Sequence, residues 1–410
     1  DCSADALAGR LLPDARPLPE EERTRRRSLF TVLRALIGLF YSEEDAHLGL
    51  YGAFGYDLAF ALEPMPLTLE RPADQRDLLL YLPDELLIVD HRREVAARIS
   101  YDFTVGGVST EGLPRAGEDA PFRPAETNDG AAASDHEAGA YEAAVEAVRN
   151  ACRRGDLFEC VLSQTLTRPT ALPPSELFRR LKERNPAPYG ALLNLGEGEF
   201  LVAASPEMFV RVQGRRVETC PISGTVARGQ DALGDAAQIR KLLNSAKDEA
   251  ELTMCTDVDR NDKARVCRPG SVQVTGRRQV ELYSRLIHTV DHVVGELAPG
   301  FDALDAFLTH TWAVTVTGAP KRRAMRMIEE TERSSRRWYG GALGFLGFNG
   351  SLNTGLTLRT LRLKDGLAEA RVGATLLYDS DPKAEEAECR IKVAALLSAL
   401  DEPAAAEAPP

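Results

Sequence analysis

The fold is decided by residues 340–378, which read G-G-A-L-G-F-L-G-F-N-G-S-L-N-T-G-L-T-L-R-T-L-R-L-K-D-G-L-A-E-A-R-V-G-A-T-L-L-Y. This stretch divides into three β-rich segments, at 340–349, 353–363 and 367–378. It leads into a helix that is rich in acidic residues. Further strands are expected at 157–166 and across 190–213. Antiparallel strands with helices between them, and no internal repeat, predict an α+β layered domain rather than a parallel sheet.

The rest of the chain also mixes strands and helices. Residues 76–104 are expected to form antiparallel strands, broken at Pro83–Asp84 and at the charged turn His91–Glu94. Helices are expected at 138–154, 174–184, 238–256 and 318–330. The last of these helices has Thr317 as its expected N-cap and Pro320 inside its first turn.

Composition divides the chain into four parts. These are a β-rich N-terminal part at 1–105, a flexible loop or linker at 106–136, a part of the same domain at 137–400 that holds the acidic helices, and a linker-like tail at 401–410. The chain opens with D-C-S-A-D and ends in an Ala/Pro/Glu tail. Both ends therefore look like the edges of an excerpt, and no signal peptide is apparent.

The overall composition excludes several classes of protein. The chain has 410 residues and a formal net charge of −12, which argues against nucleic-acid or anionic-membrane partners. No run of about 18 apolar residues is present, so no transmembrane helix is expected. The 7 cysteines lack C-x-x-C spacing and are typical of reduced thiols in a cytoplasmic protein.

Two acidic pairs lie on expected helices in different parts of the chain. Asp248 and Glu251 are spaced i, i+3, as are Glu385 and Glu388, with Lys392 one turn further along. Such pairs are usually no more than solvated helix faces. If the two faces converge, however, an all-oxygen set without His or Cys suits Mg²⁺.

Six motifs occur in a fixed order. They are C-P-I-S-G-T at 220–225, D-V-D-R-N-D at 257–262, T-V-T-G-A-P-K at 315–321, W-Y-G-G-A-L-G at 338–344, L-R-T at 358–360 and D-S-D-P-K-A-E-E-A-E at 379–388. Together they closely resemble the chorismate-utilising enzymes, and within them the synthase component of anthranilate synthase. The variants E-A-E-L-T-M-C and N-T-G-L-T-L-R-T are most similar to the subtype fused to a glutamine amidotransferase. The resemblance implies antiparallel β-sheets packed face to face with helices on the outside, in αββα-like layers.

The resemblance implies a magnesium site. By position, Asp248, Glu251, Glu385 and Glu388 match the Mg²⁺ ligands of the family. A metal held there would grip the ring carboxylate of chorismate and offset charge that spreads from the ring. Lys392 falls at the family's catalytic lysine position, close to the carboxylate and the metal.

The resemblance also implies a substrate-binding set. Arg359 and Tyr339 match positions that hold the pyruvyl carboxylate, and arginine suits this as a bidentate donor. On its own, Arg359 would more simply be interpreted as part of a surface ion pair. The full set implied is Ser223, Gly224, Thr225, Tyr339, Arg359, Gly373, Ala374 and Thr375.

Three further positions are implied to be catalytic. Glu207 matches the general acid that protonates the departing ring hydroxyl, which requires a raised pKa. His288 matches the histidine that assists aromatisation or loss of pyruvate. Thr315, like Thr225, is expected to hydrogen-bond substrate oxygens. Taken singly, each has a plainer interpretation, as a core histidine or as a strand or turn threonine.

Two absences indicate the nucleophile. Relatives that add water have a lysine at the position of Glu159, and aminodeoxychorismate synthases have a lysine at that of Ser223. Without either lysine, ammonia is the expected nucleophile. It would come from a glutamine amidotransferase domain or subunit, because nothing in the chain resembles a glutaminase site.

Some positions depart from the family pattern. Asp248 stands where glutamate is commoner, Thr375 where glycine is usual, Leu252 where histidine is usual and Val314 where glycine is usual. The L-L-E-S segment of the family's tryptophan pocket has no match, so feedback control is left open.

The sequence therefore predicts a Mg²⁺-dependent lyase that converts chorismate and ammonia into anthranilate and pyruvate, for tryptophan or another anthranilate-derived product. Two alternatives stay open. One is a synthase that stops at aminodeoxyisochorismate, and the other is a non-catalytic homologue that serves as a scaffold. Homo-oligomerisation is also left open.

Overall fold

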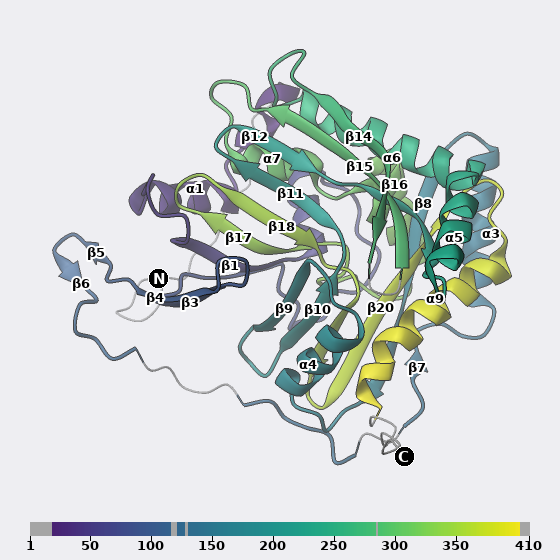
Figure 1. Ribbon diagram of the computed structural model, residues 1–410, viewed down its shortest axis with the longest axis horizontal. Helices are drawn as coiled ribbons and strands as arrows, with labels where there is room; N and C mark the ends of the chain where they lie inside the picture. Colours follow the sequence, from purple (N-terminus) through teal and green to yellow (C-terminus); the bar gives the residue numbers. More distant parts are fainter. Residues whose placement is uncertain (1–18, 116–120, 128–129, 284–285, 402–410) are drawn as a thin grey trace.

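Two large antiparallel sheets organise the molecule (Figure 1). The computed structural model describes residues 19–115, 121–127, 130–283 and 286–401. Within these residues the sheets have nine and seven strands, and two further ribbons have two strands each. All strand pairings in the two large sheets are antiparallel, which confirms the expected α+β class.

The larger sheet draws its strands from distant parts of the chain. In order across the sheet these are β13 (Ile222–Ala227), β15 (Leu286–Glu296), β12 (Arg216–Thr219), β11 (Met208–Gln213), β18 (Leu352–Leu356), β17 (Ala342–Gly347), β1 (Gly49–Phe54) and β2 (Leu78–Tyr81). The strand β14 (Gln273–Leu282) pairs along β15. N-terminal strands thus lie beside strands from the last quarter of the chain.

The smaller sheet has a buried centre. Its order is β16 (Gly318–Ala319), β8 (Glu159–Pro169), β20 (Leu367–Leu376), β19 (Thr360–Lys364), β10 (Phe200–Ser205) and β9 (Tyr189–Asn194), and β7 (Ala133–Ser134) pairs with β8. The first seven residues of β8 are all buried, as expected for a strand covered on both faces. The edge strand β9 instead alternates between half-buried and exposed positions.

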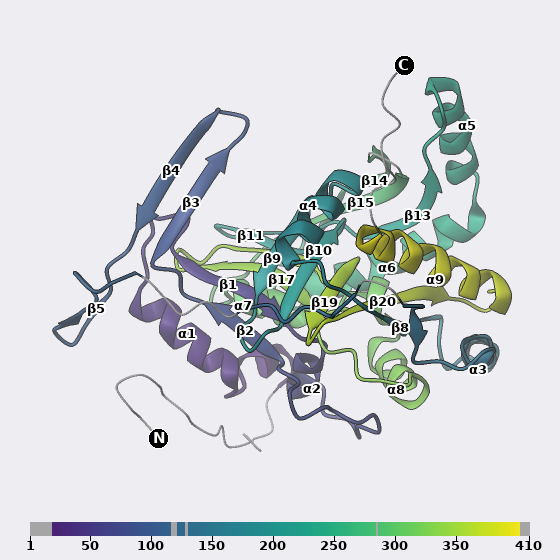
Figure 2. The same ribbon diagram turned by 90° about the horizontal axis from the view of Figure 1, so that it is seen from below.

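Two small ribbons and nine α-helices complete the described part of the chain. The ribbons pair β3 (Glu85–Asp90) with β4 (Val95–Ser100), and β5 (Thr104–Val105) with β6 (Val108–Ser109). The helices are α1 (Leu29–Leu39), α2 (Ala59–Leu62), α3 (Ala140–Arg153), α4 (Pro174–Arg184), α5 (Ala232–Leu243), α6 (Ala246–Ala264), α7 (Ala303–His310), α8 (Lys321–Thr331) and α9 (Pro382–Leu397). Figure 2 shows the β3–β4 ribbon projecting from the body of the molecule.

Each large sheet has its own hydrophobic core. The smaller sheet packs against α3, α4, α8 and α9, through buried residues such as Val148 and Leu396. The larger sheet packs against α1, α2 and α7, through residues such as Phe30 and Phe307. A third, much smaller cluster centred on Trp338 joins the two sheets. The junction between the sheets is therefore less apolar than either core, and polar groups can gather there.

The predicted strand at 353–363 is wrong as a single element. It forms two strands, β18 in the larger sheet and β19 in the smaller one. The break falls at Arg359, which has a φ of 48°. A non-glycine residue rarely adopts this left-handed conformation, and here it turns the chain from one sheet to the other.

Two helix predictions also need correction. The expected helix at 238–256 is two helices, because the chain breaks after Leu243 and α6 starts afresh with Ser245 as its N-cap. The expected N-cap Thr317 does not cap α8. Pro320 occupies the N-cap position, without a capping hydrogen bond. The hydroxyl of Thr317 donates instead to the carbonyl oxygen of Ala313.

The N-terminal predictions are confirmed in outline. The breaks expected at Pro83–Asp84 and His91–Glu94 separate β2, β3 and β4. The expected loop at 106–136 holds only short strands where it is described, and residues 116–120 and 128–129 lie outside the described part. The tail at 401–410 lies outside it after Asp401.

Candidate active site

The site is built where the chain crosses between the two sheets. Glu207 follows β10 of the smaller sheet and precedes β11 of the larger one, and Arg359 lies at the reverse crossing between β18 and β19. The backbones of the two crossings are hydrogen-bonded: Leu356 N donates to Glu207 O at 3.0 Å, and Ala204 N donates to Arg359 O at 3.1 Å. Two residues that are distant in sequence are thereby fixed side by side.

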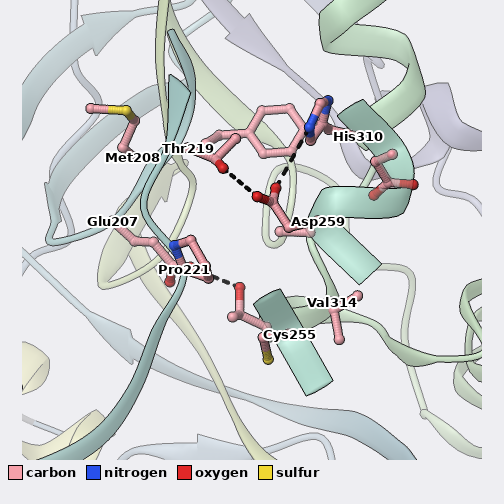
Figure 3. Close-up of a pocket in the computed structure, with 12 residues that line it drawn as sticks. Glu207, Met208, Thr219, Pro221, Cys255, Asp259, His310 and Val314 are labelled. Carbon is pink, nitrogen blue, oxygen red and sulfur yellow. Dashed lines mark hydrogen bonds and ion pairs between the residues drawn. The ribbon is translucent and has the colours of Figure 1, made fainter. Parts of the chain in front are cut away.

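Glu207 is a buried acid. Only 5% of it is exposed, and burial raises the pKa of its carboxyl to about 8. The hydroxyl of Thr315 donates to Glu207 Oε1 at 2.9 Å, a contact that opposes the shift but does not cancel it. Glu207 is one of the residues that line the pocket in Figure 3. Glu207 therefore keeps a proton to donate near neutral pH.

Arg359 carries an unpaired positive charge. Its guanidinium makes no hydrogen bond or ion pair with any residue that the structure describes. Burial lowers its pKa, and the neighbouring Glu207 and Tyr283 act in the opposite direction. An unpaired guanidinium in a half-buried position is ready to bind an anion, and a carboxylate matches its fork of donors. The interpretation of Arg359 as part of a surface ion pair is wrong.

His288 is held by a threonine and leaves one nitrogen unpartnered. Its Nδ1 lies 2.9 Å from Thr225 Oγ1, and its Nε2 is buried without a partner among the described residues. Burial, followed by the charge of Arg359, lowers the pKa of the imidazole to about 4. The edge of the Tyr283 ring packs against it, with ring centroids 5.1 Å apart. His288 is thus a neutral imidazole beside Arg359.

The two threonines expected to bind substrate hydrogen-bond ionisable side chains of the site. The hydroxyls of Thr225 and Thr315 bond His288 and Glu207, and their hydrogen bonds to substrate oxygens stay a prediction. A hydroxyl can donate one hydrogen bond and still accept others, so both residues orient the ionisable groups.

A β-bulge shapes the C-P-I-S-G-T segment. The pairing of β13 with β15 shifts between Ser223 and Thr225, and Gly224 in the bulge has a φ of 82°. A Cβ at Gly224 would lie 2.9 Å from Leu242 Cδ1 and 3.1 Å from Asp248 Cβ. Only glycine fits there, and the bulge brings the segment against α5 and α6.

The second carboxylate cradle lies on β20. Gly373 and Thr375 are half-buried and Ala374 is buried. A Cβ at Gly373 would lie 2.8 Å from the hydroxyl oxygen of Tyr339. Lys392 on α9 donates from Nζ to Gly373 O at 3.0 Å. The structure therefore brings these residues together, as the sequence suggested.

The acidic pairs lie on α6 and α9, whose first turns come together. Lys247 Nζ on α6 lies 3.3 Å from Glu385 Oε1 on α9, and Lys392 Nζ lies 2.6 Å from Glu388 Oε1. Burial raises the pKa of Glu251, and the charges of Asp248 and Glu388 add to this. Lysines thus neutralise part of the cluster. The described residues contain no group of three or more His, Cys, Asp or Glu residues arranged to hold a metal.

Local sequence explains where these acids sit. Ser245 caps α6 by accepting a hydrogen bond from Asp248 N, and Asp381 caps α9 by accepting one from Ala384 N. Asp248 and Glu385 therefore lie in first helical turns. The positive end of the helix dipole favours carboxylates at such positions.

Sequence reasoning missed a buried ionic network behind Glu207. Asp259 accepts from Lys263 Nζ at 2.9 Å and from the Thr219 hydroxyl, and its Oδ1 lies 3.5 Å from His310 Nε2 (Figure 3). Lys263 is fully buried. Burial lowers the pKa of His310 to about 3, which leaves the ring neutral.

The signal for this network was present in two motifs. Asp262 of D-V-D-R-N-D forms an ion pair with Lys321 of T-V-T-G-A-P-K. This ion pair joins α6 to the start of α8. Both motifs are visible in the sequence, which assigns these residues no role. Asp259 and Asp262 of the first motif and Lys321 of the second belong to the internal salt-bridge network.

A small cavity separates this network from Glu207 (Figure 3). It has a volume of about 30 Å³, which suits a molecule of the size of water and is far too small for an organic ring. Its lining includes Glu207, Thr315, Pro221, Cys255 and Asp259.

Comparison with known proteins accounts for this arrangement. The family model described as chorismate binding enzyme matches residues 18–398. This chain belongs to the chorismate-binding enzymes. Within that family it belongs to the anthranilate synthase component 1 group, on the evidence of two relatives and a solved structure.

Anthranilate synthase of Azospirillum brasilense is 65% identical over 393 residues, which cover 96% of this chain and 53% of that protein. The chain thus spans about half the length of that relative. Anthranilate synthase component 1 of Streptomyces coelicolor is 38% identical over 375 residues, covering 86% of this chain and 73% of that protein. The crystal structure of anthranilate synthase component I from Streptococcus pneumoniae matches with a TM-score of 0.77 and 30% identity, over 89% of this chain and 85% of that one.

Family membership agrees with the fold of this chorismate-binding enzyme. None of its described helices has the length and apolar character needed to cross a membrane.

Proposed function

We propose that this chain carries out the synthase reaction of anthranilate synthase, which converts chorismate and ammonia into anthranilate and pyruvate. One observation carries the proposal. Arg359 lies within electrostatic reach of both Glu207 and His288, so an unpaired cation has a protonated acid and a neutral imidazole as neighbours. Chorismate chemistry needs these three kinds of group: one to bind a carboxylate, one to protonate a leaving hydroxyl and one to move a proton from the ring.

Two separate places are available for the two carboxylates of chorismate. Arg359 supplies a guanidinium group with parallel N–H donors. The hydroxyl of Tyr339 lies close to Gly373, a residue of the strand β20. Lys392 bonds the carbonyl oxygen of Gly373 and pairs with Glu388 of the acidic cluster on α6 and α9. We assign the pyruvyl carboxylate to Arg359 and Tyr339, with the backbone of Gly373, Ala374 and Thr375 and the bulge at Ser223, Gly224 and Thr225 as further contacts.

The first step is an addition with loss of water. Ammonia forms a C–N bond at the ring carbon beside the one that bears the carboxylate, the ring double bonds shift, and the C–O bond to the hydroxyl breaks. Glu207 gives its proton to the hydroxyl, which leaves as water. The new ammonium group then loses one proton, which restores Glu207. Thr315 holds the Glu207 carboxyl in position.

The second step is loss of pyruvate. A proton leaves the ring, the C–O bond to the enolpyruvyl group breaks, and protonation of that group gives pyruvate. His288 is suited to accept the ring proton because its Nε2 is buried without a partner and its imidazole is neutral. Thr225 holds the imidazole ring of His288 in position through a hydrogen bond to Nδ1.

We propose Mg²⁺ as the cofactor, with Asp248, Glu251, Glu385 and Glu388 as the residues that would hold it. The all-carboxylate donor set suits this ion in chemistry, and burial, with the charges of Asp248 and Glu388 adding to it, raises the pKa of Glu251. The two lysines already paired there indicate that the cluster attracts positive charge. When bound, the ion would bind the ring carboxylate and neutralise the cluster.

We propose that ammonia is supplied by a glutamine amidotransferase, as a domain of the same protein or as a separate subunit. Free ammonium would replace it in a test with this chain alone. The product would serve the synthesis of tryptophan or of another anthranilate derivative.

The test is incubation of this chain with chorismate, magnesium chloride and ammonium chloride near pH 8, with products separated by chromatography. Anthranilate with equimolar pyruvate is the expected result. Aminodeoxyisochorismate without pyruvate would assign the alternative reaction, in which only the first step occurs. Absence of both products would refute the proposal.

A further inference from the structure

A second acid shares the small cavity with Glu207. Asp259 of α6 and Glu207 both line this cavity of about 30 Å³, and both are drawn in Figure 3. Only 13% of the Asp259 side chain is exposed. The two carboxyl groups come from distant parts of the chain, so the fold has brought two acids to one small space.

Asp259 is held as an anion. Its Oδ2 accepts one hydrogen bond from Lys263 Nζ at 2.9 Å and another from the hydroxyl of Thr219 at 2.5 Å. Burial works against the charged form, but the charge of Lys263 and these hydrogen bonds outweigh it and keep the pKa of Asp259 below its usual value. Asp259 is therefore negatively charged at the pH of about 8 where Glu207 loses its proton.

The other oxygen of Asp259 lacks a donor. Nδ1 of the neutral His310 ring lies 2.7 Å from the carbonyl oxygen of Ala306, which can only accept, so Nδ1 carries the ring proton. His310 Nε2 accepts from Lys263 Nζ at 3.4 Å. It also lies 3.5 Å from Asp259 Oδ1 but has no proton to give. Among the residues that the structure describes, none donates a hydrogen bond to Oδ1.

The cavity has the size and the chemistry to hold water. A buried water molecule needs at least two polar partners, and a buried carboxylate oxygen needs a donor. Asp259 Oδ1 can accept from the water. The Glu207 carboxyl and the Thr315 hydroxyl, which are hydrogen-bonded to each other at 2.9 Å, line the same space and supply further partners.

We propose that Asp259 is a positioning residue of the synthase reaction, which acts on the acid Glu207 through its negative charge and through a water molecule bound in the cavity. The inference rests on the proposed function. Two carboxylates that face one small cavity repel each other, so the charge of Asp259 favours the protonated form of Glu207. The water donates to Asp259 Oδ1 and presents its oxygen to the neutral Glu207 carboxyl.

Two opposite charges set the pH at which Glu207 loses its proton. Besides burial, the charge of Asp259 raises the pKa of Glu207, whereas Arg359 lowers it. The other titratable groups that face Glu207 are Tyr283 at the end of β14, Cys255 and Asp262 on α6 and His310 on α7. Removal of the Asp259 charge should therefore leave Arg359 to favour the ionised acid.

The experiment compares wild type with Asp259→Asn, which removes the charge at nearly constant size, and with Asp259→Glu, which keeps the charge. Rates are measured from pH 6.5 to pH 9.5 at saturating chorismate and equal ammonium. We expect Glu207 to lose its proton about one pH unit earlier in Asp259→Asn. Its rate relative to wild type should then fall from near one at pH 6.5 to roughly one tenth at pH 9. Asp259→Glu should follow wild type.

A second variant guards against misfolding. Asp259→Asn leaves Lys263 buried without its ion-pair partner, which destabilises a fold. Asp259→Asn combined with Lys263→Met removes both charges, and it should shift the pH dependence in the same direction. A shift in neither variant would overturn the inference.

The matched control is Asp291→Asn. Asp291 is another buried aspartate that accepts a threonine hydroxyl, from Thr256 on α6 at 2.6 Å, but it does not line the cavity. Its rate relative to wild type should be the same at every pH, even if it unfolds at a lower temperature. A pH-dependent loss in Asp291→Asn equal to that in Asp259→Asn would overturn the inference.

A direct titration of Glu207 does not depend on turnover. The infrared band of its protonated carboxyl is identified as the one lost in Glu207→Gln, and is then followed with pH in wild type and in Asp259→Asn. A midpoint about one unit lower in Asp259→Asn supports the inference, and equal midpoints overturn it. If wild type forms no anthranilate, the proposed function fails, and these midpoints still decide whether Asp259 acts on Glu207.

The bound water has its own test. A high-resolution crystal structure of wild type should show an ordered water molecule in the cavity, within hydrogen-bonding distance of Asp259 Oδ1. A cavity without water would overturn the water bridge between Asp259 and Glu207.

Discussion

Three side chains in this chorismate-binding enzyme owe their chemistry to burial. Burial favours the neutral form of an acid and of an imidazole alike, so it raises the pKa of Glu207 to about 8 and lowers that of His288 to about 4. Arg359 stays charged and lies within reach of both. The result is a proton donor, a proton acceptor and an anion site in one place, without any ion pair between them.

The first prediction concerns Glu207→Gln. Loss of the proton donor should lower kcat roughly 10²- to 10⁴-fold, with chorismate binding retained. The wild-type rate should fall as pH rises through about 8, because Glu207 then loses its proton. Rates and chorismate affinity across pH check both statements. A variant with wild-type kcat would exclude Glu207 as the acid.

The same substitution should change how stability depends on pH. The folded pKa of about 8 lies above the ordinary value of 4.5, so the folded protein holds a proton that the unfolded chain releases between these values. The free energy of unfolding should therefore decrease with rising pH across this window, an effect that Glu207→Gln removes. Denaturant unfolding at several pH values measures the difference between the two proteins.

The second prediction concerns Arg359. Arg359→Lys keeps the charge but loses the fork, and should raise the KM for chorismate by roughly 10- to 150-fold, equivalent to about 1.5–3 kcal/mol. Arg359→Met should abolish chorismate binding yet raise the melting temperature, because an unpaired half-buried charge costs free energy of folding. Kinetics and thermal unfolding measure the two effects. A lower melting temperature for Arg359→Met would show that the guanidinium stabilises the fold after all.

At the scale of elements, the site depends on irregular backbone rather than on regular strands. The crossings at Glu207 and Arg359 and the bulge at Gly224 interrupt strands that would otherwise continue. Each interruption turns side chains away from a hydrophobic core and towards the junction of the sheets. Regular strands would have kept alternate side chains inside a core.

The third prediction tests the bulge. Gly224→Ala should combine the cost of a left-handed backbone, about 1–2 kcal/mol, with overpacking of about 1–3 kcal/mol against Leu242 and Asp248. The control is Gly214→Ala, which also has a positive φ, of 57°, but has no atom within 4 Å of the new Cβ. It should show only the backbone cost. Equal losses of unfolding free energy would mean that the contacts at Gly224 are unimportant.

At the scale of the whole molecule, the site is the place where two hydrophobic cores meet. α6 belongs to the middle of the chain and α9 to its end, and they approach each other through Lys247 and Glu385. Figures 1 and 2 show both helices on the same side of the molecule. A cation held between α6 and α9 would therefore link two segments that are far apart in the sequence.

The fourth prediction follows from this arrangement. Mg²⁺ should stabilise wild type by about 2.7 kcal/mol at a concentration 100-fold above its dissociation constant. Glu388→Gln should lose most of this stabilisation. Glu386→Gln, which removes the same charge from the same helix but is paired with Arg390, should keep it. Thermal unfolding with magnesium chloride or with a chelator measures the effect, and equal responses of the two variants would rule out these carboxylates as the metal site.

The sequence by itself determined the classes of element and the chemistry available. Hydrophobic alternation and turn residues predicted most strands, and acidic spacing placed Asp248, Glu251, Glu385 and Glu388 on helices, because these patterns act over a few residues. The ordered motifs indicated the family, which the comparisons confirm.

Only the tertiary structure decided which polar groups are paired and which are free. Asp262 and Glu207 are both buried acids within quoted or matched segments, yet one binds Lys321 and the other keeps its proton. The sequence marks Glu159 only as an acid where relatives that add water have a lysine, and its burial against α6 and β16 appears only in the tertiary structure. Burial and pairing depend on partners up to hundreds of residues away. No local pattern encodes which of them the crossing of two sheets will bring together.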